Sequence, residues 1–490
     1  MLRKIRITLA TLAFIGLSWL FLDFTGTAHH FLGWLAKVQA LEAVLALNVV
    51  VIVLLALLTL IFGRIYCSII CPLGIVQDVF GWLGKKAKKN RYTYSSEKKW
   101  LRYGMLGVFI LAIVVGASSI VQLLAPYSAF GRIMTMIFQP LWMMCNNLLA
   151  SIAEHYESYA FYSVDVWMKS LPVLIIATLT LVVLIVLAWR NGRTYCNTVC
   201  PVGTVLSFLS RFSLLKISID TEKCHNCSLC ARNCKAACID FKNHSIDYSR
   251  CVVCGDCLEK CNSKALKYGI PHLHKTQKNT ETDSSRRSFL LSSALLTTAV
   301  LAQEKKVFDG GYIDLEDKVA PERQTPLTPP GSLSAQNMAL RCTGCQLCVS
   351  GCPNDVLRPS TDLMHLMQPI MSYEHGYCRP ECTRCSEVCP AGAIKPIDRE
   401  EKASIQIGHA VWVKKNCVPL TDNVECGNCA RHCPTGAIEM VPLDENDEES
   451  PYIPAINENA CIGCGACEYV CPARPFSAIY VEGHEVHKTI

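Results

Sequence analysis

The sequence predicts a mixed fold, in which a four-helix transmembrane unit is followed by compact α+β modules rich in cysteine. The chain has 490 residues, of which 51% are hydrophobic and only 18% charged, and this is too apolar for an ordinary soluble protein. It also contains 30 cysteines, which a chain of this length does not need as disulfide staples. The composition therefore predicts a membrane protein that also binds metal.

Charge and motif content exclude several classes of protein. The 47 Lys and Arg residues exceed the 41 Asp and Glu residues by only 6, too few for a nucleic-acid-binding surface. The sequence has no P-loop and no G-x-G-x-x-G for a nucleotide cofactor, and no C-x-x-C-H for covalent haem. Electrons must therefore enter and leave through small carriers or protein partners, and in a membrane the natural small carrier is a quinol.

Four apolar runs without any Lys, Arg, Asp or Glu predict the transmembrane helices. They cover residues 7–22, 44–62, 104–125 and 171–189, each close to the roughly 20 residues that a membrane helix needs. Basic residues gather before the first run and in the loop 63–102, so both ends of this unit are predicted to face the cytoplasm. A cleaved signal peptide at the N-terminus is the alternative, but no small-residue cleavage site follows the first run.

An internal repeat lies within the predicted helical unit, which covers residues 1–215. Residues 63–74 read GRIYCSIICPLG and residues 192–203 read GRTYCNTVCPVG, which predicts two duplicated helical hairpins. A C-x3-C-P pair at a helix end suits a redox dithiol, a metal or a bridging sulfur species, and the alternative is a set of small buried residues. The redox candidates are Cys67, Cys71, Cys196 and Cys200.

Residues 216–274 form a predicted module with two C-x2-C-x2-C-x3-C runs, the spacing that bacterial ferredoxins use for [4Fe–4S] clusters. Three thiolates of a run wrap one cubane, and the fourth ligates the partner cluster, so we expect crossed ligation. Lys235 and Asn262 stand where a proline normally follows the fourth cysteine, and Cys238 is a spare thiol that could substitute for Cys234. The expected ligand sets are Cys224, Cys227, Cys230 and Cys261 for one cluster, and Cys251, Cys254, Cys257 and Cys234 for the other.

A twin-arginine pattern lies between the two cysteine-rich regions, in the segment 275–302. Arg286 and Arg287 precede a short apolar run that ends near Ala302, which is typical of a twin-arginine export signal placed inside the chain. Such a route carries folded cargo and so suits a module already loaded with clusters. A linker helix is the alternative, and cleavage near Ala302 is left open. Residues 303–335 are Pro-rich and predict an extended linker.

The last module, residues 336–490, contains four more runs, and each ends in Cys-Pro. Zinc ribbons do not repeat triplets followed by x3-C-P, and cysteines at x2 spacing are poorly placed to form disulfides with one another. The chain is therefore expected to hold six clusters on 24 of its 30 cysteines. The ligands predicted in this module are Cys342, Cys345, Cys348 and Cys352; Cys378, Cys382, Cys385 and Cys389; Cys417, Cys426, Cys429 and Cys433; and Cys461, Cys464, Cys467 and Cys471.

These motifs carry a resemblance to known electron-transfer proteins. Residues 1–270 resemble the NapH-type membrane subunit of quinol dehydrogenases, and are similar to parts of the nitrous-oxide-reductase accessory protein and of the methylamine-utilisation ferredoxins. Residues 285–490 resemble the NapG-type exported polyferredoxin. The resemblance implies oxidation of menaquinol or ubiquinol at the bacterial inner membrane. It implies a cytoplasmic two-cluster module and a periplasmic four-cluster module that serves a periplasmic or membrane-associated redox partner.

Several questions stay open at the level of the sequence. An accessory protein that delivers electrons to an immature metalloenzyme, a link to a cytoplasmic dehydrogenase and a redox sensor are the alternatives, although six clusters favour conduction over sensing. The terminal acceptor and the direction of electron flow are not determined. A proton acceptor for the quinol is poorly marked. The candidates at the outer interface are Asp23, His29, His30, Glu42, Glu154 and His155.

Overall fold

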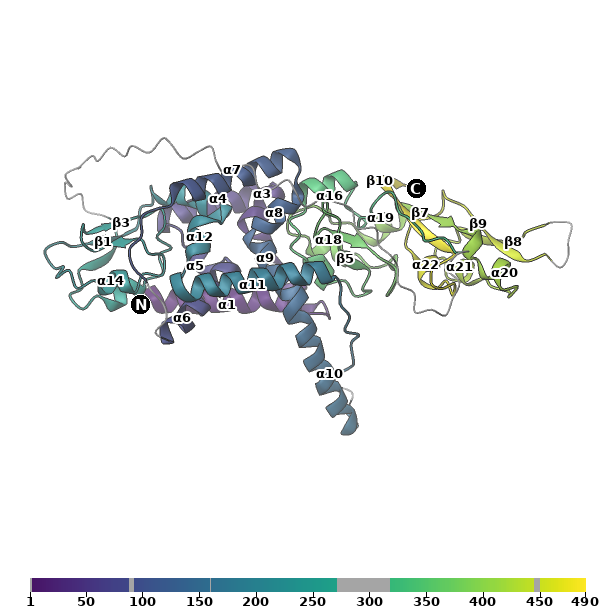
Figure 1. Cartoon of the computed structure of the whole chain (residues 1–490), viewed down its shortest axis with the longest axis horizontal. Coiled ribbons are helices and arrows are strands. Elements are labelled where there is room, and N and C mark those ends of the chain that lie inside the picture. The colour runs from purple at the N-terminus through teal and green to yellow at the C-terminus, as the bar shows by residue number, and fades with distance from the viewer. Residues whose placement is uncertain (1, 88–91, 159, 271–317, 445–449) are drawn as a thin grey trace.

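Three regions follow one another along the long axis of the molecule (Figure 1). The computed structural model describes residues 2–87, 92–158, 160–270, 318–444 and 450–490. A helical unit (residues 2–213) forms the middle, the first cysteine module (216–270) lies at one end, and the second cysteine module (318–490) lies at the other. The twin-arginine pattern and Ala302 lie outside the described residues.

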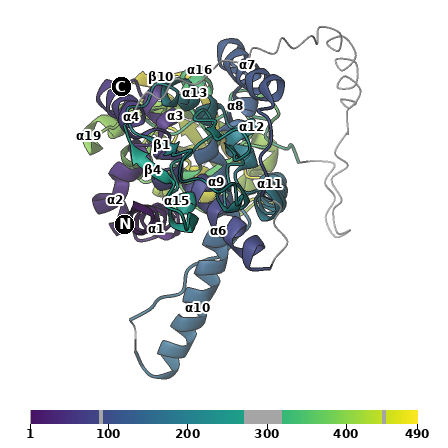
Figure 2. The same cartoon turned by 90° about the vertical axis from the view of Figure 1, so that its left-hand side faces the viewer.

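Four helices of the helical unit surround its long axis. Figure 2 looks down this axis and shows α1, α4, α7 and α11 around it, with α10 pointing away from them. The helices of the unit are α1 (Leu2–Leu22), α2 (Thr27–Lys37), α3 (Ala40–Leu45), α4 (Val49–Phe62), α5 (Tyr66–Ile69), α6 (Pro72–Lys86), α7 (Lys99–Val115), α8 (Ser118–Leu124), α9 (Pro126–Ile133), the π-helix η1 (Met134–Phe138), α10 (Gln139–His155), α11 (Leu171–Asn191), α12 (Thr194–Thr198) and α13 (Pro201–Ser210).

The four predicted spans differ in the structure. Among the described residues, α1 and α11, with 21 residues each, are long and apolar enough to cross a membrane, and the segments Ser118–Leu124 and Pro126–His155, bent by 79°, are a third candidate if taken together. The predicted run 104–125 is not one helix, because Gly116 adopts a left-handed conformation (φ 79°) and ends α7. The run 44–62 is divided by Asn48, whose side chain caps α4. The described residues therefore do not form four uninterrupted spans.

The two repeat copies adopt the same local structure. In each copy a long helix ends at a glycine with positive φ, Gly63 or Gly192, where an L side chain would be strained. A short helix follows, and then an extended cysteine, Cys71 or Cys200, precedes a proline at the first position of the next helix. The two copies also pack against each other: α6 of the first copy packs against α11 of the second, and α13 of the second packs against α4 of the first. The duplication thus produces one interlocked unit instead of two separate hairpins.

The two cysteine modules are built from short helices and two-stranded antiparallel sheets. In the first module β1 pairs with β4 and β2 with β3; in the second β5 pairs with β6, β7 with β10 and β8 with β9. The elements of the first are β1 (Lys216–Ile219), α14 (Leu229–Arg232), β2 (Ile239–Asp240), β3 (Ser245–Ile246), α15 (Asp256–Lys260) and β4 (Leu266–Gly269). Those of the second are α16 (Ala335–Arg341), α17 (Leu347–Ser350), β5 (Leu357–Pro359), β6 (Pro369–Met371), α18 (Arg384–Val388), α19 (Arg399–Ser404), β7 (Ile405–Trp412), the 3-10 helix η3 (Lys414–Asn416), α20 (Val418–Thr421), α21 (Asn428–Arg431), β8 (Ile438–Pro442), β9 (Tyr452–Ile456), α22 (Ala466–Tyr469) and β10 (Ile479–Thr489).

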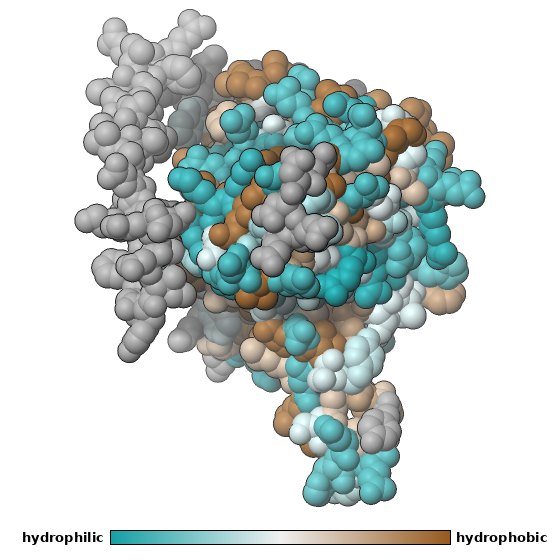
Figure 3. Space-filling model, turned by 90° about the vertical axis from the view of Figure 1, so that its right-hand side faces the viewer, coloured by the Kyte–Doolittle hydropathy of each residue, from teal (hydrophilic) through white to brown (hydrophobic). Residues whose placement is uncertain are grey.

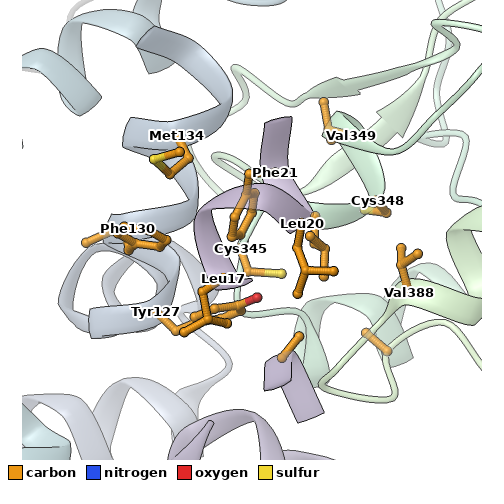
Figure 4. Packing of buried hydrophobic residues seen from close by; sticks show 14 of the residues in the cluster. Leu17, Leu20, Phe21, Tyr127, Phe130, Met134, Cys345, Cys348, Val349 and Val388 are labelled. Carbon is orange, nitrogen blue, oxygen red and sulfur yellow. The ribbon is translucent and has the colours of Figure 1, made fainter. Parts of the chain in front are cut away.

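The second cysteine module packs directly on the helical unit through its first cysteine run. Cys345 lies in one buried cluster with Phe21 of α1 and Phe130 of α9 (Figure 4). A Cβ added to Gly131 would stand 2.0 Å from the carbonyl oxygen of Cys345, so only glycine permits this approach. The hydroxyl of Ser128 donates to the carbonyl of Gly344 at 3.1 Å. The run that begins at Cys342 is therefore fixed against the helices.

The first cysteine module is joined to the opposite end of the helical unit by buried charges. The Asp78 carboxylate, on α6, lies 2.7 Å from the Arg6 guanidinium of α1, 2.7 Å from the Nε of Arg193 and 2.9 Å from the Nζ of Lys235. Burial by itself raises the pKa of Asp78, but the positive charges of Arg193 and Lys235 outweigh burial and hold the pKa well below its usual range. One carboxylate therefore connects two helical elements with the first module.

Replacing this carboxylate is expected to destabilise the whole protein. Asp78→Asn leaves three buried cations without their shared counter-charge, and losing one partner of a buried pair costs about 3–5 kcal/mol. The measurement is the thermal unfolding midpoint of the detergent-solubilised, anaerobic protein. Glu259→Gln is the matched control, because Glu259 pairs with Arg3 at the surface, where an ion pair contributes less than about 1 kcal/mol. Equal midpoints for the two variants would contradict the central role of Asp78.

Candidate iron–sulfur centres

The cysteines of the second module group across the runs, as crossed ligation requires. Cys389 lies within electrostatic range of Cys342, Cys345 and Cys348, although it belongs to the next run. Cys352, in turn, lies beside the run that begins at Cys378. The fourth cysteine of each run is therefore delivered to the neighbouring group of three thiols.

The last two runs repeat this exchange. Cys471 lies beside Cys417 and Cys429, and Cys433 lies beside Cys461 and Cys464.

The four groups follow one another in a row. Each group is named here after one of its cysteines. The Cys461 group, which includes Cys464, adjoins the Cys378 group, because the backbone N–H of Cys378 donates to the carbonyl of Cys464 at 2.9 Å. The row therefore begins at the Cys345 group, against the helices, and continues through the Cys378 and Cys461 groups to the Cys417 group.

The surroundings of these thiols suit anionic iron–sulfur clusters. Backbone N–H groups donate to sulfur at Cys342 (3.4 Å), Cys433 (3.3 Å) and Cys471 (3.2 Å), the kind of hydrogen bond that tunes a cluster. The buried ammonium group of Lys402 lies close to Cys378 and donates to the carbonyl of Cys382 at 2.5 Å. The residues present therefore fit the group that the cysteine spacing predicts.

In the first module, the structure brings Cys234 to the second run. Cys234 lies close to Cys254 and Cys257, as crossed ligation requires, while Cys224, Cys227 and Cys230 form the other group. The assignment of Cys261 to that group remains a prediction. The spare thiol, Cys238, is buried, and its Sγ lies 3.5 Å from the Sγ of Cys234. The geometry thus keeps Cys238 within reach of the site that Cys234 is predicted to serve.

Lys235, which replaces the expected proline, has a structural role. Its Nζ lies 2.9 Å from Asp78 and 3.2 Å from Asp256, and its carbonyl accepts from the backbone N–H of Arg193 at 2.8 Å. A proline could supply neither the charge nor the reach. The departure from the usual ferredoxin pattern therefore marks the attachment of the first module to the helices.

The four cysteines of the repeat converge inside the helical unit. Cys67, Cys71, Cys196 and Cys200 are each only 4% exposed, and the thiol of Cys71 lies within electrostatic range of the other three. Figure 1 shows that the short helices α5 and α12, which carry one cysteine of each pair, lie between the surrounding long helices. The sequence predicts two separate pairs, and only the fold makes them one group of four.

The predicted proton acceptors at the outer interface have different surroundings. The Asp23 carboxylate accepts hydrogen bonds from the backbone N–H groups of Thr25, Gly26 and Ala28, which is a local structural role. Glu42 is buried on α3, whereas Glu154 and His155 lie at the exposed end of α10. His29 is buried and His30 is exposed.

A cavity that sequence reasoning missed lies at the other end of the helical unit. It has a volume of about 460 Å³ and lies where α1 and α6 meet the first cysteine module. Ile7, Val79 and Trp82 form an apolar side, whereas Lys85 and Lys235 belong to a charged side. Lys235 and Asp256 also neighbour the predicted ligands Cys234 and Cys257 in sequence. Lys235, which replaces the expected proline after Cys234, is the feature of the sequence that could have pointed to this cavity.

Crossed ligation predicts a specific pattern of iron loss in double variants. If Cys352 serves the Cys378 group, Cys352→Ser combined with Cys385→Ser removes one cluster, about four irons per chain. Cys352→Ser combined with Cys348→Ser removes two clusters, about eight irons. Iron and acid-labile sulfide of the anaerobic protein are the measurements. The reverse pattern, about eight irons for the first pair and about four for the second, would show ligation within each run.

Comparison with known proteins agrees with these centres. A model described as a 4Fe-4S binding domain matches residues 44–91 and 171–220, so each matched segment contains one repeat copy. Two models described as 4Fe-4S dicluster domains match residues 247–356 and 424–474. No solved structure matches the chain.

Three of the curated relatives each match less than half of the chain. The ferredoxin-type protein NapG of Escherichia coli is 30% identical over 171 residues, 33% of this chain and 73% of NapG. NapH of Haemophilus influenzae is 25% identical over 224 residues, 43% of this chain and 64% of NapH. The methylamine utilization protein MauN of Paracoccus denitrificans is 25% identical over 230 residues, 46% of this chain and 65% of MauN. The chain thus spans less than two thirds of NapH and of MauN, and 37% of an uncharacterized protein of Methanocaldococcus jannaschii. The chain is an iron–sulfur electron-transfer protein that belongs to the family of NapG-type ferredoxin proteins, and it is related to NapH.

Proposed function

We propose that the protein oxidises a quinol, menaquinol or ubiquinol, at the bacterial inner membrane and passes the electrons through [4Fe–4S] clusters to a periplasmic redox partner. The observation that carries this proposal is the cavity of about 460 Å³ beside the predicted ligands Cys234 and Cys257. Small-molecule sites are concave, largely apolar and of this size, with a few polar groups that fix the orientation.

The cavity has the two sides that a quinol needs. Ile7, Val79 and Trp82 line it and are also exposed on the flanks of α1 and α6, so an apolar tail has a route from the lipid. Arg3 and Lys85 offer hydrogen-bond donors to the ring oxygens.

Two protons and two electrons leave a quinol when it becomes a quinone. Clusters held by the cysteines would accept these electrons one at a time. Asp78 stays ionised between its cations and therefore orients them. Glu259 lines the same cavity and is the more exposed acid, with Arg3 as its ion-pair partner, so we assign it the role of proton acceptor: it takes the two protons one after the other and releases each to water.

We infer the membrane orientation from the basic residues near one end of the molecule. We place the first cysteine module at the cytoplasmic face, where the basic residues Lys85, Lys86, Lys98 and Lys99 gather, and the second at the periplasmic face. In this arrangement α1, α11, α3 with α4, and α7 with α8 make the four crossings of a multi-pass unit.

Electrons leave at the far end of the second module in this proposal. The row of cysteine groups ends at the Cys417 group, and Val424 and Tyr452 are exposed on the strands and loops around it. The end of the molecule that faces the viewer in Figure 3 carries many hydrophilic residues, as a surface in contact with water should. A soluble redox protein is the partner that fits this end.

An accessory role is the second candidate. The relatives bear two different names, ferredoxin-type protein NapH and methylamine utilization ferredoxin-type protein MauN, so the names do not point to one common partner. An immature metalloenzyme would use the same donor side and the same row of centres. Neighbouring genes for a large reductase favour respiration, and genes for cofactor assembly favour the accessory role.

Filling the cavity is expected to block the quinol and spare the clusters. Val79→Trp should slow reduction of the clusters by a menaquinol analogue in liposomes at least about tenfold, because the added ring occupies the apolar side. EPR follows the reduction, and dithionite, which needs no binding site, should still reduce all clusters. Val183→Trp on α11 is the matched control, because Val183 is 47% exposed, as Val79 is 46% exposed, but does not line the cavity. Normal quinol-driven reduction in Val79→Trp would contradict this site.

The orientation can be tested through the twin arginines. With a tag after Ile490, protease added to spheroplasts should remove the tag from the wild-type protein and spare a tag inserted after Lys86. Arg286→Lys with Arg287→Lys should make the C-terminal tag resistant, since the export machinery requires both arginines. Lys275→Arg is the control. A C-terminal tag that is protected in the wild type would place the second module in the cytoplasm and favour a cytoplasmic dehydrogenase as partner.

A further inference from the structure

We infer that Cys67, Cys71, Cys196 and Cys200 together hold one [4Fe–4S] cluster, a seventh centre that lies between the two cysteine modules. This inference goes beyond the proposed function and holds whatever the electron donor is. Each repeat copy supplies only two thiols, so neither copy can ligate a cubane alone. The fold supplies the complete set of four, each 4% exposed.

The two copies meet through a reciprocal exchange of arginines. The Nη1 of Arg64, from the first copy, donates to the side-chain oxygen of Asn197 at 2.9 Å, and its Nη2 donates to the carbonyl of Cys196 at 3.2 Å. Arg193, from the second copy, donates to the carbonyl of Cys67. Each arginine thus fixes the cysteine loop of the other copy, which keeps the four thiols in one place.

The charge around the thiols calls for an anion. Arg64 is fully buried, and the hydrogen-bond acceptors recorded for it in the described part of the chain are neutral: Asn197, the carbonyls of Ser249 and Cys196, and the Cys67 sulfur. Its Nε has no partner there. A buried cation without a counter-charge is costly. A cubane with four thiolate ligands carries net negative charge and would balance it.

Hydrogen bonds to sulfur follow the pattern of the cluster-binding runs. The side-chain amide of Gln77 donates to the Sγ of Cys196 at 3.1 Å, and the backbone N–H of Gly203 donates to the Sγ of Cys200 at 3.4 Å. The N–H of Gly344 reaches Cys342 at the same distance, 3.4 Å. Such donors stabilise sulfur that carries negative charge.

Glycines make room for the loops around the four thiols. A Cβ on Gly74 or Gly203 would stand 2.3 or 2.4 Å from the carbonyl of Cys67 or Cys196. The last glycine of each motif copy is therefore required by close approach to the preceding cysteine loop of the same copy.

A disulfide and a single metal ion are the two alternatives to a cluster at this site. All four cysteines are free, so no disulfide joins a pair. Across the described residues no three Cys, His, Asp or Glu side chains come together tightly enough to hold a single ion, and this includes the ferredoxin runs. In this respect the four thiols do not differ from the runs whose sequence spacing is typical of [4Fe–4S] ligation.

The four thiols lie between the two cysteine modules. On one side, Arg64 donates to the carbonyl of Ser249 at 2.9 Å, two residues before Cys251. On the other side, one continuous buried core runs from Cys71 to Cys345. A cluster here would therefore stand between the centres of the first module and the first centre of the second, and make the two modules one path for electrons.

Iron content tests the inference directly. Cys67→Ser with Cys196→Ser in the full chain should lose about four irons and about four sulfides per chain relative to the wild type, the content of one cubane. Cys385→Ser is the comparator that shows the loss of one predicted cluster. Cys145→Ser, an exposed cysteine on α10, is the control that should lose none. Unchanged iron in the double variant, with the comparator reduced, overturns the inference, and so does a loss of about two irons.

A second variant separates loss of the cluster from loss of the fold. Gln77→Leu removes the donor to Cys196 and keeps all four thiols, so the iron content should stay at the wild-type value. The midpoint potential of one EPR signal should fall, because a hydrogen bond to a cluster sulfur favours the reduced, more negative state. That signal should be missing from the Cys67→Ser, Cys196→Ser variant. A redox titration of Gln77→Leu in which every signal keeps its potential overturns the inference.

Discussion

The exchange of arginines between the two repeat copies is the constraint on which the rest of the helical unit depends. Arg64 and Arg193 are fully buried, and a buried guanidinium is tolerated only where it is bonded. Each donates to a backbone carbonyl of the opposite copy, Arg64 to that of Cys196 and Arg193 to that of Cys67. The arginines of the two motif copies therefore join the copies to each other.

Asp78 extends this constraint to the first cysteine module. Its carboxylate receives Arg193 from the second copy and Lys235 from the loop after Cys234, so the same arginine that orders the repeat also helps to attach the module. Lys235 continues to Asp256, which neighbours Cys254 and Cys257. A chain of alternating charges thus links the interior of the helical unit with a predicted cluster site, and the cavity proposed for the quinol lies along it.

The second module is attached by a different interaction. Its contact with the helices is close packing of backbone and apolar side chains: Cys345 fits against Gly131, and the aromatic rings of Phe21 and Phe130 surround the contact (Figure 4). Such an interface excludes water and holds its distance, which suits electron transfer between centres that must stay close. Buried charges thus attach the first cysteine module to the helical unit, and apolar packing attaches the second.

The cysteine runs could be predicted from the sequence because ligand spacing is a local property. The spacing of three cysteines within one loop predicts a [4Fe–4S] cluster. Lys235 and Cys238 could also be recognised in the sequence as departures from the usual ferredoxin pattern. The apolar runs 7–22 and 171–189 likewise matched α1 and α11, since hydropathy over about 20 residues is local as well. The breaks at Asn48 and Gly116 were missed, because hydropathy does not detect a helix end inside an apolar run.

Contacts between distant residues were decided only by the tertiary structure. Cys67 and Cys196 are 129 positions apart in the printed sequence, and no spacing rule relates them. The same is true of the cavity, whose walls come from α1, α6 and the first module, and of Cys345 against Gly131. The sequence by itself determined which residues can ligate iron and where apolar helices run. The packing of the two copies determined which ligands meet, because each buried arginine needs acceptors and finds part of them in the opposite copy.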